Sequence, residues 1–508
     1  MSQIRAEHLT FGYDSSIEPV FEDVSFTIDT DWKLGLIGRN GKGKTTLLHL
    51  LTGELSGRGA LIKSVPVAYF PYTVTAEQMK LSAAEFAEEL RKDCELWRVI
   101  CELSQLDENA DILYRPFETL SYGQRTKVLL AILFSGENDF LLIDEPTNHL
   151  DVNAREIVRR YLTAKKGFIL VSHDRDLLDA CTDHILVLNR KTIMVQSGNF
   201  SCWQENKERM DKFAEAENEK HRKEIRKLRQ SAKRASEWAD KSERTKIGFD
   251  PVKEHDRGSG ARAFIGAKTK KMQSRVKNIE RRIEREISEK EGLLQDVEEI
   301  SALKMEPLTH FKDTLVTVRD CELKYKDAAA PMCRGLTFDV KQGERIALRG
   351  ANGCGKSTLM RVILQTAGLI PRDEALLVSG VCGTASRLVI SYVPQDASFL
   401  RGSIPDFCRE RGLDRSLFST ILRQLDLSRT QLAMDISGYS AGQKKKVLLA
   451  ASLMTPAHLY IWDEPLNYID IFSRMQIEKL LEAYRPTMLF AEHDIRFREN
   501  IATETVSF

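Results

Sequence analysis

Two short stretches of this 508-residue chain fit the pattern G-x-x-x-x-G-K-[ST]. The first runs from Gly38 to Thr45 and the second from Gly350 to Ser357, and each follows an apolar, strand-like segment. Glycines at this spacing let successive backbone N–H groups point at one anion, and the following helix adds its positive N-terminal end. The pattern predicts two phosphate-binding loops, and therefore two sites for ATP.

Other residues repeat in register with these loops. An aromatic residue stands 31 positions before each loop lysine, and a Ser-x-Gly-Gln stretch begins 23 positions before an Asp-Glu pair in both halves of the chain. One loop match can arise by chance, but a four-part repeat at fixed spacing is not expected by chance. We infer two copies of one nucleotide-binding unit.

The residues that complete each loop suit phosphate chemistry. We expect Lys44 and Lys356 to reach the β and γ phosphates of ATP. The next hydroxyls, those of Thr45 and Ser357, are suited to coordinate Mg²⁺. Each unit is therefore expected to neutralise a triphosphate and to hold its metal ion.

The Asp-Glu pair ends an apolar run in each unit. We expect the aspartates, Asp144 and Asp463, to lie on the Mg²⁺ side of the site. The adjacent glutamates, Glu145 and Glu464, are expected to orient and activate the attacking water. The predicted reaction is hydrolysis of ATP to ADP and phosphate.

A histidine follows each glutamate at the end of a further apolar run. His173 lies 28 residues after Glu145, and His493 lies 29 residues after Glu464. A histidine at a strand end is most often structural. Matching places in a repeat favour a catalytic role, in which each histidine positions the γ phosphate or its water.

Length and composition limit the class of protein. A chain of 508 residues is too long for one core, and 42% hydrophobic with 29% charged residues is typical of a soluble globular protein. No apolar run approaches the roughly 20 residues of a membrane helix, and the start lacks the apolar segment of a signal peptide. The nine cysteines show no zinc-like spacing, which favours free thiols and a cytoplasmic protein.

Strand-like apolar runs alternate with helical stretches in both repeat units, which predicts an α/β fold. The clearest runs are residues 140–143, 167–171, 459–462 and 488–491. We predict two tandem nucleotide-binding domains, residues 1–200 and 312–508, joined by a linker at residues 201–311.

The linker is expected to be a helical hairpin. Residues 201–247 contain neither Gly nor Pro, and apolar residues step by three and four there and again after residue 272. Two such stripes predict an antiparallel pair of helices, each covering the other's apolar seam. A 45-residue helix rises roughly 65 Å. The Gly-containing stretch at 248–266 is the predicted tip.

The charge of the chain is concentrated in this linker. Residues 221–285 hold 21 Lys and Arg against 9 Asp and Glu, a net charge of +12, which leaves −11 for the rest. Such a segment favours binding to a polyanion, although a solvated charged helix is the common alternative. The tip carries Phe249, His255, Arg257, Arg262 and Phe264, which suit stacking on unpaired bases and binding to RNA backbone. For each residue alone a merely flexible loop fits equally well, but for the tip as a whole we favour RNA binding.

Residues 120–124 and 439–443 match the signature motif of the ATP-binding cassette superfamily, which the whole chain resembles. The resemblance implies that Ser121 and Ser440, with nearby backbone amides, close on the γ phosphate held by the opposite cassette. Tyr13 and Tyr325 would then stack on adenine. The expected nucleotide contacts are Tyr13, Gly38, Asn40, Gly41, Gly43, Lys44, Thr45, Thr46, Ser121, Gly123, Gln124, Tyr325, Gly350, Asn352, Gly353, Gly355, Lys356, Ser357, Thr358, Gln395, Ser440, Gly442 and Gln443.

The same resemblance implies a head-to-tail pairing of the cassettes within one monomer. Lys44 would share one ATP with Ser440, and Lys356 would share the other with Ser121. Asp151 and Asp470 would lie in the loops that cross between the two sites. Nucleotide would drive closure, because phosphate charge is met by groups from both halves.

The segments 145–151 and 462–470, with the long charged linker, resemble the F subfamily (ABC-F) and its branch that protects ribosomes from lincosamides, pleuromutilins and group A streptogramins. This resemblance implies that the hairpin enters the tRNA exit site and that its tip reaches towards the peptidyl-transferase centre. The expected partners are 23S rRNA and tRNA, without a membrane or DNA.

The chain also departs from the family pattern. Gln395, an expected Mg²⁺ ligand, follows a strand and a proline in the second cassette, whereas the first cassette has Tyr72 at that place. Tyr72 offers no amide oxygen, so slower hydrolysis is expected at the Lys44 site. Tyr122 and Ala441 replace signature glycines, and the separation of 77 positions from Lys44 to Ser121 leaves little room for the inserted arm of some relatives.

Three other functions fit parts of the pattern. A housekeeping translation factor of the same subfamily would use the hairpin to adjust tRNA. The fused ATPase subunit of an importer also has two cassettes in this length, but needs no basic hairpin. A chromosome or DNA-repair ATPase carries its coiled coil inside a cassette, whereas here the helical segment lies between two complete units.

Overall fold

The computed structural model describes residues 2–13, 19–92, 94–147, 150, 152–188, 192–244, 305–326, 328, 330–351 and 353–508. The chain divides into two compact units, Met1–Trp203 with Ile300–Phe508, and Gln204–Glu299. We call residues 2–203 the first cassette and residues 305–508 the second cassette. The sequence-based boundaries at 200/201 and 311/312 stay a prediction.

The first cassette is built on a largely parallel sheet of strand order β5-β6-β7-β3-β8-β9, with an antiparallel sheet of order β2-β1-β4 beside it. β6 is a continuous apolar run that is buried until its last residue, as expected of a parallel strand covered on both faces. The strands are β1 (Gln3–Phe11), β2 (Phe21–Asp29), β3 (Lys33–Gly38), β4 (Arg58–Lys63), β5 (Val67–Phe70), β6 (Phe140–Asp144), β7 (Phe168–Val171), β8 (His184–Leu188) and β9 (Ile193–Ser197).

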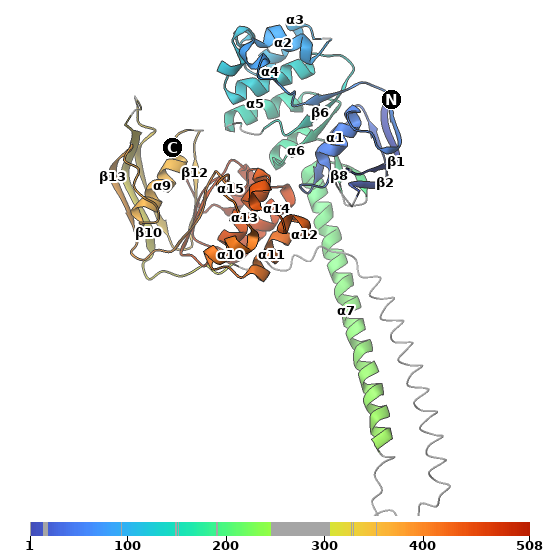
Figure 1. The fold of residues 1–508 in the computed structure, drawn as a ribbon, viewed down its shortest axis with the longest axis vertical. Coiled ribbons are helices and arrows are strands. Elements are labelled where there is room, and N and C mark those ends of the chain that lie inside the picture. The colour runs from blue at the N-terminus through green and yellow to red at the C-terminus, as the bar shows by residue number, and fades with distance from the viewer. Residues whose placement is uncertain are drawn as a thin grey trace, which may run out of the picture. The chain divides into compact units, whose positions relative to one another are not determined.

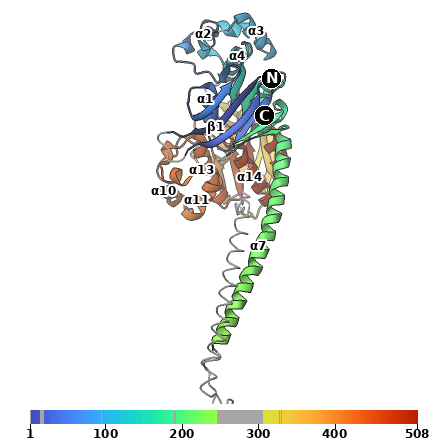
Figure 2. The same ribbon diagram turned by 90° about the vertical axis from the view of Figure 1, so that its right-hand side faces the viewer.

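The helices of the first cassette flank this sheet and also form a helical layer of their own, in which α2, α3 and α4 lie together (Figures 1 and 2). They are α1 (Lys44–Thr52), α2 (Ala83–Leu90), α3 (Leu96–Gln105), α4 (Tyr122–Phe134), α5 (Val152–Thr163) and α6 (Arg175–Cys181), with short 3-10 turns η1 (Gln78–Lys80), η2 (Ala110–Tyr114) and η3 (Phe117–Thr119).

The second cassette repeats this plan. Its parallel sheet has the order β14-β15-β16-β12-β17 and its antiparallel sheet the order β11-β10-β13. The strands are β10 (Thr314–Tyr325), β11 (Cys333–Lys341), β12 (Arg345–Arg349), β13 (Leu376–Thr384), β14 (Ile390–Val393), β15 (Leu459–Asp463), β16 (Met488–Ala491) and β17 (Glu504–Ser507). The helices are α9 (Lys356–Thr366), α10 (Ile404–Arg411), α11 (Arg415–Gln424), α12 (Arg429–Leu432), α13 (Ala441–Met454), α14 (Ile471–Tyr484) and α15 (Ile495–Ile501), with η4 (Ile436–Gly438).

This architecture confirms the predicted α/β class with two tandem units. The four strand-like runs expected from the sequence fall on β6, β7, β15 and β16. These strands are adjacent in their sheets, β6 beside β7 and β15 beside β16, with parallel register. Their carboxyl ends therefore bring the expected catalytic residues of each cassette to one edge of a sheet.

The two cassettes share apolar and ionic contacts. Ile471, at the start of α14, is buried in the same cluster as core residues of the first cassette. Arg175 of the first cassette donates to Glu478 and Asp494 of the second. The halves thus pack on each other through buried side chains as well as surface groups.

The helix α7 (Phe200–Arg244) is unbroken over 45 residues (Figures 1 and 2). Its first turn is anchored in the cassette unit, where Asp179 accepts hydrogen bonds from the Ser201 backbone at 2.7 Å and hydroxyl at 2.5 Å. Arg496 of the second cassette donates to the Ser201 hydroxyl at 3.3 Å, and the Trp203 ring meets Phe472 edge to face. The expected second helix of the hairpin and its tip at 248–266 lie outside the described residues.

None of the helices in the described ranges is long and apolar enough to cross a membrane.

Candidate functional site

Each phosphate-binding loop joins a central strand to a helix that starts at the loop lysine. Gly43 and Gly355 precede α1 and α9 with φ of 94° and 104°, in the left-handed region that favours glycine. A Cβ at Gly43 would also lie 2.5 Å from the Val20 side chain. The backbone of each loop is thus wound so that the helix N-terminus is open to an anion.

Both loop lysines fold over their own loop. Lys44 Nζ donates to the Gly38 carbonyl at 2.7 Å and lies 3.2 Å from Asn40 Oδ1. Lys356 Nζ donates to the Gly350 and Ala351 carbonyls, each at 2.8 Å. Burial lowers the pKa of Lys44. Asn352, the expected counterpart of Asn40, lies outside the described residues.

The expected Mg²⁺ residues lie together in each cassette. Thr45 Oγ1 donates to Asp144 Oδ2 at 3.1 Å, and Ser357 lies close enough to Asp463 to favour its ionised form. Burial raises the pKa of both aspartates. Asp463 Oδ1 is buried without a hydrogen-bond partner in the described part of the chain. A hydroxyl beside a buried carboxyl oxygen fits Mg²⁺, which prefers oxygen ligands.

In the second cassette, three side chains hold the expected catalytic glutamate. Glu464 Oε2 accepts from Gln395 at 2.9 Å and from Asn467 at 2.7 Å, and Oε1 lies 3.2 Å from His493 Nε2. Burial opposes ionisation, but the contacts from His493 and Gln395 and the charge of Lys356 outweigh it and lower the pKa of Glu464 to about 2. The amide of Gln395 thus faces the glutamate here, and its role as a Mg²⁺ ligand stays a prediction.

In the described part of the first cassette, the corresponding contacts are longer, and Asn148, the sequence counterpart of Asn467, lies outside the described residues. The backbone N–H of His173 donates to Glu145 Oε2 at 3.4 Å, and the ring Nε2 lies 3.4 Å from Oε1. Among the described residues, Oε1 has no hydrogen-bond partner. Burial, reinforced by the neighbouring Asp144 charge, raises the pKa of Glu145 to about 8, and burial lowers that of His173.

The two signature serines begin helices. Ser121 and Ser440 cap α4 and α13, and each accepts from the backbone N–H of the glutamine three residues later. Gln124 and Gln443 accept in return from the serine backbone, at 3.1 and 2.9 Å. The spacing S-x-x-Q is that of a capping box and could have predicted these helix starts. The sequence analysis assigned the two glutamines to nucleotide binding alone.

Gly442 and Gly123 differ in their surroundings. A Cβ at Gly442 would lie 2.5 Å from the Tyr468 carbonyl oxygen, whereas one at Gly123 would meet nothing closer than 3.8 Å. Asn40 of the first loop donates to that same carbonyl at 3.0 Å. The Tyr468 backbone therefore lies between the first phosphate loop and the second signature helix.

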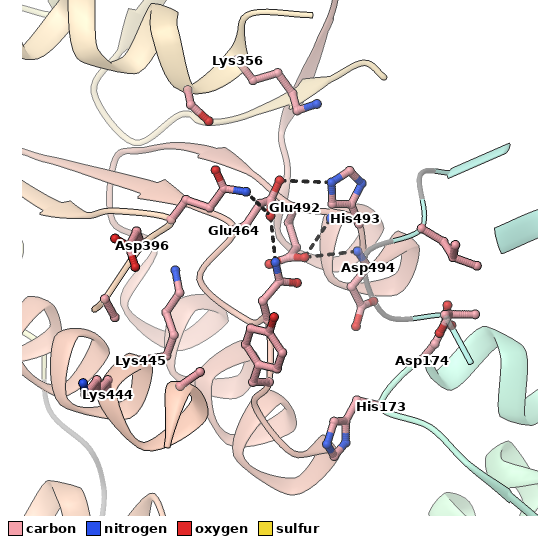
Figure 3. A pocket seen from close by; sticks show the side chains of 18 of the residues that line it. His173, Asp174, Lys356, Asp396, Lys444, Lys445, Glu464, Glu492, His493 and Asp494 are labelled. Atoms are coloured by element: carbon pink, nitrogen blue, oxygen red, sulfur yellow. Dashed lines mark hydrogen bonds and ion pairs between the residues drawn. The ribbon is translucent and has the colours of Figure 1, made fainter. Parts of the chain in front are cut away.

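A cavity of about 790 Å³ opens over the second loop (Figure 3). The second cassette lines it with Lys356, Ser357, Thr358, Gln395, Glu464 and His493, and the first cassette with Glu145, Arg155, His173 and Asp174. Figure 3 shows His173 and Asp174 on the segment of the first cassette that faces Asp494. The cavity thus brings expected catalytic residues from both cassettes to one space.

Other predicted residues lie elsewhere. Neither signature serine lines this cavity, so the pairings of Lys356 with Ser121 and of Lys44 with Ser440 stay predictions. Tyr13 is 44% exposed and its hydroxyl lies 3.0 Å from Thr46 Oγ1, while Tyr325 packs on the core under the second antiparallel sheet.

The two crossing-loop aspartates differ in what the structure describes. Asp151 lies outside the described residues. Asp470 is fully buried and pairs with Lys446 at 2.8 Å. Burial opposes its ionisation, but the Lys446 charge outweighs burial and depresses the pKa of Asp470.

Sequence reasoning missed the ionic contacts between the cassettes, of which those of Arg175 are buried and those of Arg496 half-buried. Arg175 donates to Glu478 at 2.9 and 2.5 Å, and Arg496 donates to Asp176 at 2.7 Å and also to Asp179. These pairs join residues about 300 positions apart. The positions of charged residues in the sequence do not predict these pairs, because Arg and Asp side chains are mostly exposed.

Comparison with known proteins places this geometry in a family. The family description "ABC transporter" matches residues 21–148 and 333–467, just over half of the chain. The ribosome protection protein VmlR of Bacillus subtilis (strain 168) is 27% identical over 493 residues, which cover 96% of this chain and 83% of that protein. ABC transporter F family member 2 of Arabidopsis thaliana is 25% identical, covering 99% and 76%.

A solved structure, that of the archaeal ribosome recycling factor aABCE1 in complex with an archaeal ribosomal stalk protein, superposes with a TM-score of 0.59 at 18% identity. The match covers 98% of this chain and 87% of that one, and it supports the fold. With two phosphate loops on two such cassettes, the chain belongs to the ABC transporter family as an ATPase, and it resembles the ABC-F subfamily and its resistance branch.

Proposed function

We propose that this ATPase binds the ribosome in the cytoplasm and protects it from antibiotics that act near the peptidyl-transferase centre. The drug classes proposed are lincosamides, pleuromutilins and group A streptogramins. Similarity to a named ribosome protection protein over 96% of the chain supports this choice. The observation that carries it is the pairing of two cassettes with a linker segment of net charge +12, which suits binding to rRNA and tRNA.

At each site, the loop lysine and the open helix end bind the triphosphate, and the loop hydroxyl with its aspartate holds Mg²⁺. When bound, Mg²⁺ neutralises charge that develops on the phosphates. Glu145 and Glu464 orient the attacking water, and His173 and His493 position it. The cavity over the second loop, which holds Glu464 and His493 beside Lys356, supports this assignment.

Nucleotide binding controls the linker. Two ATP molecules close the cassettes of a monomer on each other, with Ser440 facing the Lys44 site and Ser121 facing the Lys356 site. In the closed form, the hairpin enters the tRNA exit site and its tip reaches towards the drug. Hydrolysis reopens the cassettes and releases the protein.

Ribosome binding is tested by co-sedimentation. The double variant Glu145→Gln, Glu464→Gln should stay on purified ribosomes in ATP and leave them in ADP. Without hydrolysis, the closed form persists throughout the sedimentation. Its retention should weaken steeply as salt rises, as for any grip on phosphate charge. Recovery only with membranes or free DNA would remove the proposal.

Protection is tested by expression in a sensitive host against a panel of ribosome-targeting antibiotics. Wild type should raise the inhibitory concentration of the three drug classes, and deletion of residues 248–266 should abolish this while sparing ATP hydrolysis. Ribosome binding without resistance to any drug would favour the housekeeping factor, which uses the same hairpin on tRNA.

A further inference from the structure

The aspartate that follows His493 in the second cassette is held by the first cassette. Asp494 caps α15, where its Oδ1 accepts from the backbone N–H of Phe497 at 2.9 Å. Arg175 of the first cassette donates to the two oxygens of Asp494 at 3.2 and 3.3 Å. A side chain from one cassette thus contacts the residue next to His493 of the other.

Arg175 is itself fixed by a second carboxylate. Its two terminal nitrogens donate to Glu478 at 2.9 and 2.5 Å, and Arg474 donates to Asp494 at 3.0 Å. The side chains of these four residues are at most 10% exposed. Two positive and two negative charges are therefore buried together, an arrangement that is costly to disturb at any one member.

The ionised form of Asp494 depends on this cluster. Burial alone would raise its pKa, but the charges of Arg175 and Arg474 hold the pKa of Asp494 below its ordinary value. The histidine before it is fixed on its other side, because the His493 backbone N–H donates to Glu492 at 2.7 Å. The ring of His493 then lies 3.2 Å from Glu464.

The first cassette lacks the matching arrangement in its described residues. The carboxylate of Asp174, which follows His173, caps α6 by accepting from the backbone of Asp176 and Leu177 at 3.0 and 3.1 Å, and burial raises its pKa. The arginine after His493 is displaced by one position relative to Arg175, and Arg496 donates instead to Asp176, Asp179 and Ser201.

We propose that Arg175 is a positioning residue for ATP hydrolysis at the second site, where it acts from the opposite cassette. By fixing Asp494, it sets the backbone that aims His493 at Glu464. Arg175 touches no reacting atom, so its effect passes through Asp494. The proposal rests on the expected roles of Glu464 and His493 and is independent of what the linker binds.

The test measures steady-state ATP hydrolysis in a Glu145→Gln background, in which the second site carries the turnover. Arg175→Gln should lower kcat about tenfold while the KM for ATP changes less than about twofold, because a shift of His493 affects chemistry more than binding. Arg175→Lys, which keeps the charge but not the paired geometry, should recover part of that loss.

Arg496→Gln is the matched control, because it removes cross-cassette ion pairs but no contact to Asp494. Its kcat should stay within about twofold of the background even where its thermal stability falls as far as that of Arg175→Gln. Equal losses of kcat in the two variants would overturn the proposal, since both would then report a weakened interface.

A second control places Arg175→Gln in a Glu464→Gln background, where only the first site turns over. The loss should be clearly smaller there, and an equal loss would overturn the action across cassettes. Should Arg175→Gln fail to fold, Arg175→Lys decides: an unchanged kcat in the Glu145→Gln background would overturn the proposal, and about a threefold loss would support it.

Discussion

The two glutamates expected to activate water lie in unlike surroundings, although their cassettes are copies of one unit. Glu464 is held by Gln395, Asn467 and His493, and its pKa is lowered to about 2. Among the described residues, Glu145 has only long contacts, to His173, and burial raises its pKa to about 8. The repeated sequence therefore determines where each glutamate lies in the fold. The side chains around each glutamate determine its protonation state.

The strongest consequence is unequal ATP hydrolysis. At pH 7, Glu464→Gln should lower steady-state kcat about 100-fold, because it removes an ionised, well-oriented base. Glu145→Gln should lower it only about twofold, because that carboxyl is mostly protonated at this pH before catalysis. Phosphate release by the two single variants measures this. A larger loss in Glu145→Gln would reverse the comparison.

The same contrast predicts opposite effects on the stability of the nucleotide-free protein. Glu145 has a raised pKa, so it costs stability progressively as pH rises from about 5 through about 8, and Glu145→Gln removes that cost. Glu464 has a lowered pKa, so it contributes stability above about pH 4.5 that is lost as pH falls through about 2.

At pH 9 without Mg²⁺, Glu145→Gln should therefore raise the free energy of unfolding and Glu464→Gln should lower it, each by about 3–5 kcal/mol. Thermal unfolding at pH 6 and pH 9 checks this, and the gain from Glu145→Gln should be smaller at pH 6. Changes of the same sign in both variants would contradict the environments described.

The signature glycines offer a third contrast. Gly442→Ala should destabilise the second cassette by about 1–3 kcal/mol, since its Cβ would lie 2.5 Å from the Tyr468 carbonyl. Gly123→Ala should be tolerated within about 0.5 kcal/mol, because its Cβ would meet only ordinary contacts. Chemical denaturation of the two variants tests the pair. Equal effects would mean that the two helices begin in equivalent surroundings.

The smallest effect concerns the residue that distinguishes the cassettes at position 72. Tyr72→Gln supplies the amide that Gln395 offers to Glu464, and it should raise hydrolysis in a Glu464→Gln background about two- to fivefold. Gln395→Tyr, measured in a Glu145→Gln background, should lower hydrolysis. If both exchanges leave the rates unchanged, the amide does not determine the difference in ATP hydrolysis between the two sites.

The fold was predictable because its signals are local. The strands that end at Asp144 and Asp463 are continuous apolar runs, and the phosphate loops combine glycines with a helix start. Spacing alone placed each glutamate, aspartate and histidine of a cassette at one edge of a sheet. These features depend on backbone geometry, which the residue types encode directly.

The protonation states and the contacts between cassettes were not predictable. The buried group formed by Arg175, Glu478 and Asp494 depends on packing between residues far apart in the chain. The low pKa of Glu464 depends on His493 and on the amide of Gln395, which follows the end of β14. The expected hairpin tip lies outside the described residues, so its part in the site stays a prediction.

Ser201 and Trp203 attach the first turn of the long helix to both cassettes. Its first turn touches Asp179 on one cassette and Arg496 and Phe472 on the other, so a change in the angle between cassettes must rotate that turn. The start of the helix is therefore coupled to both cassettes at once.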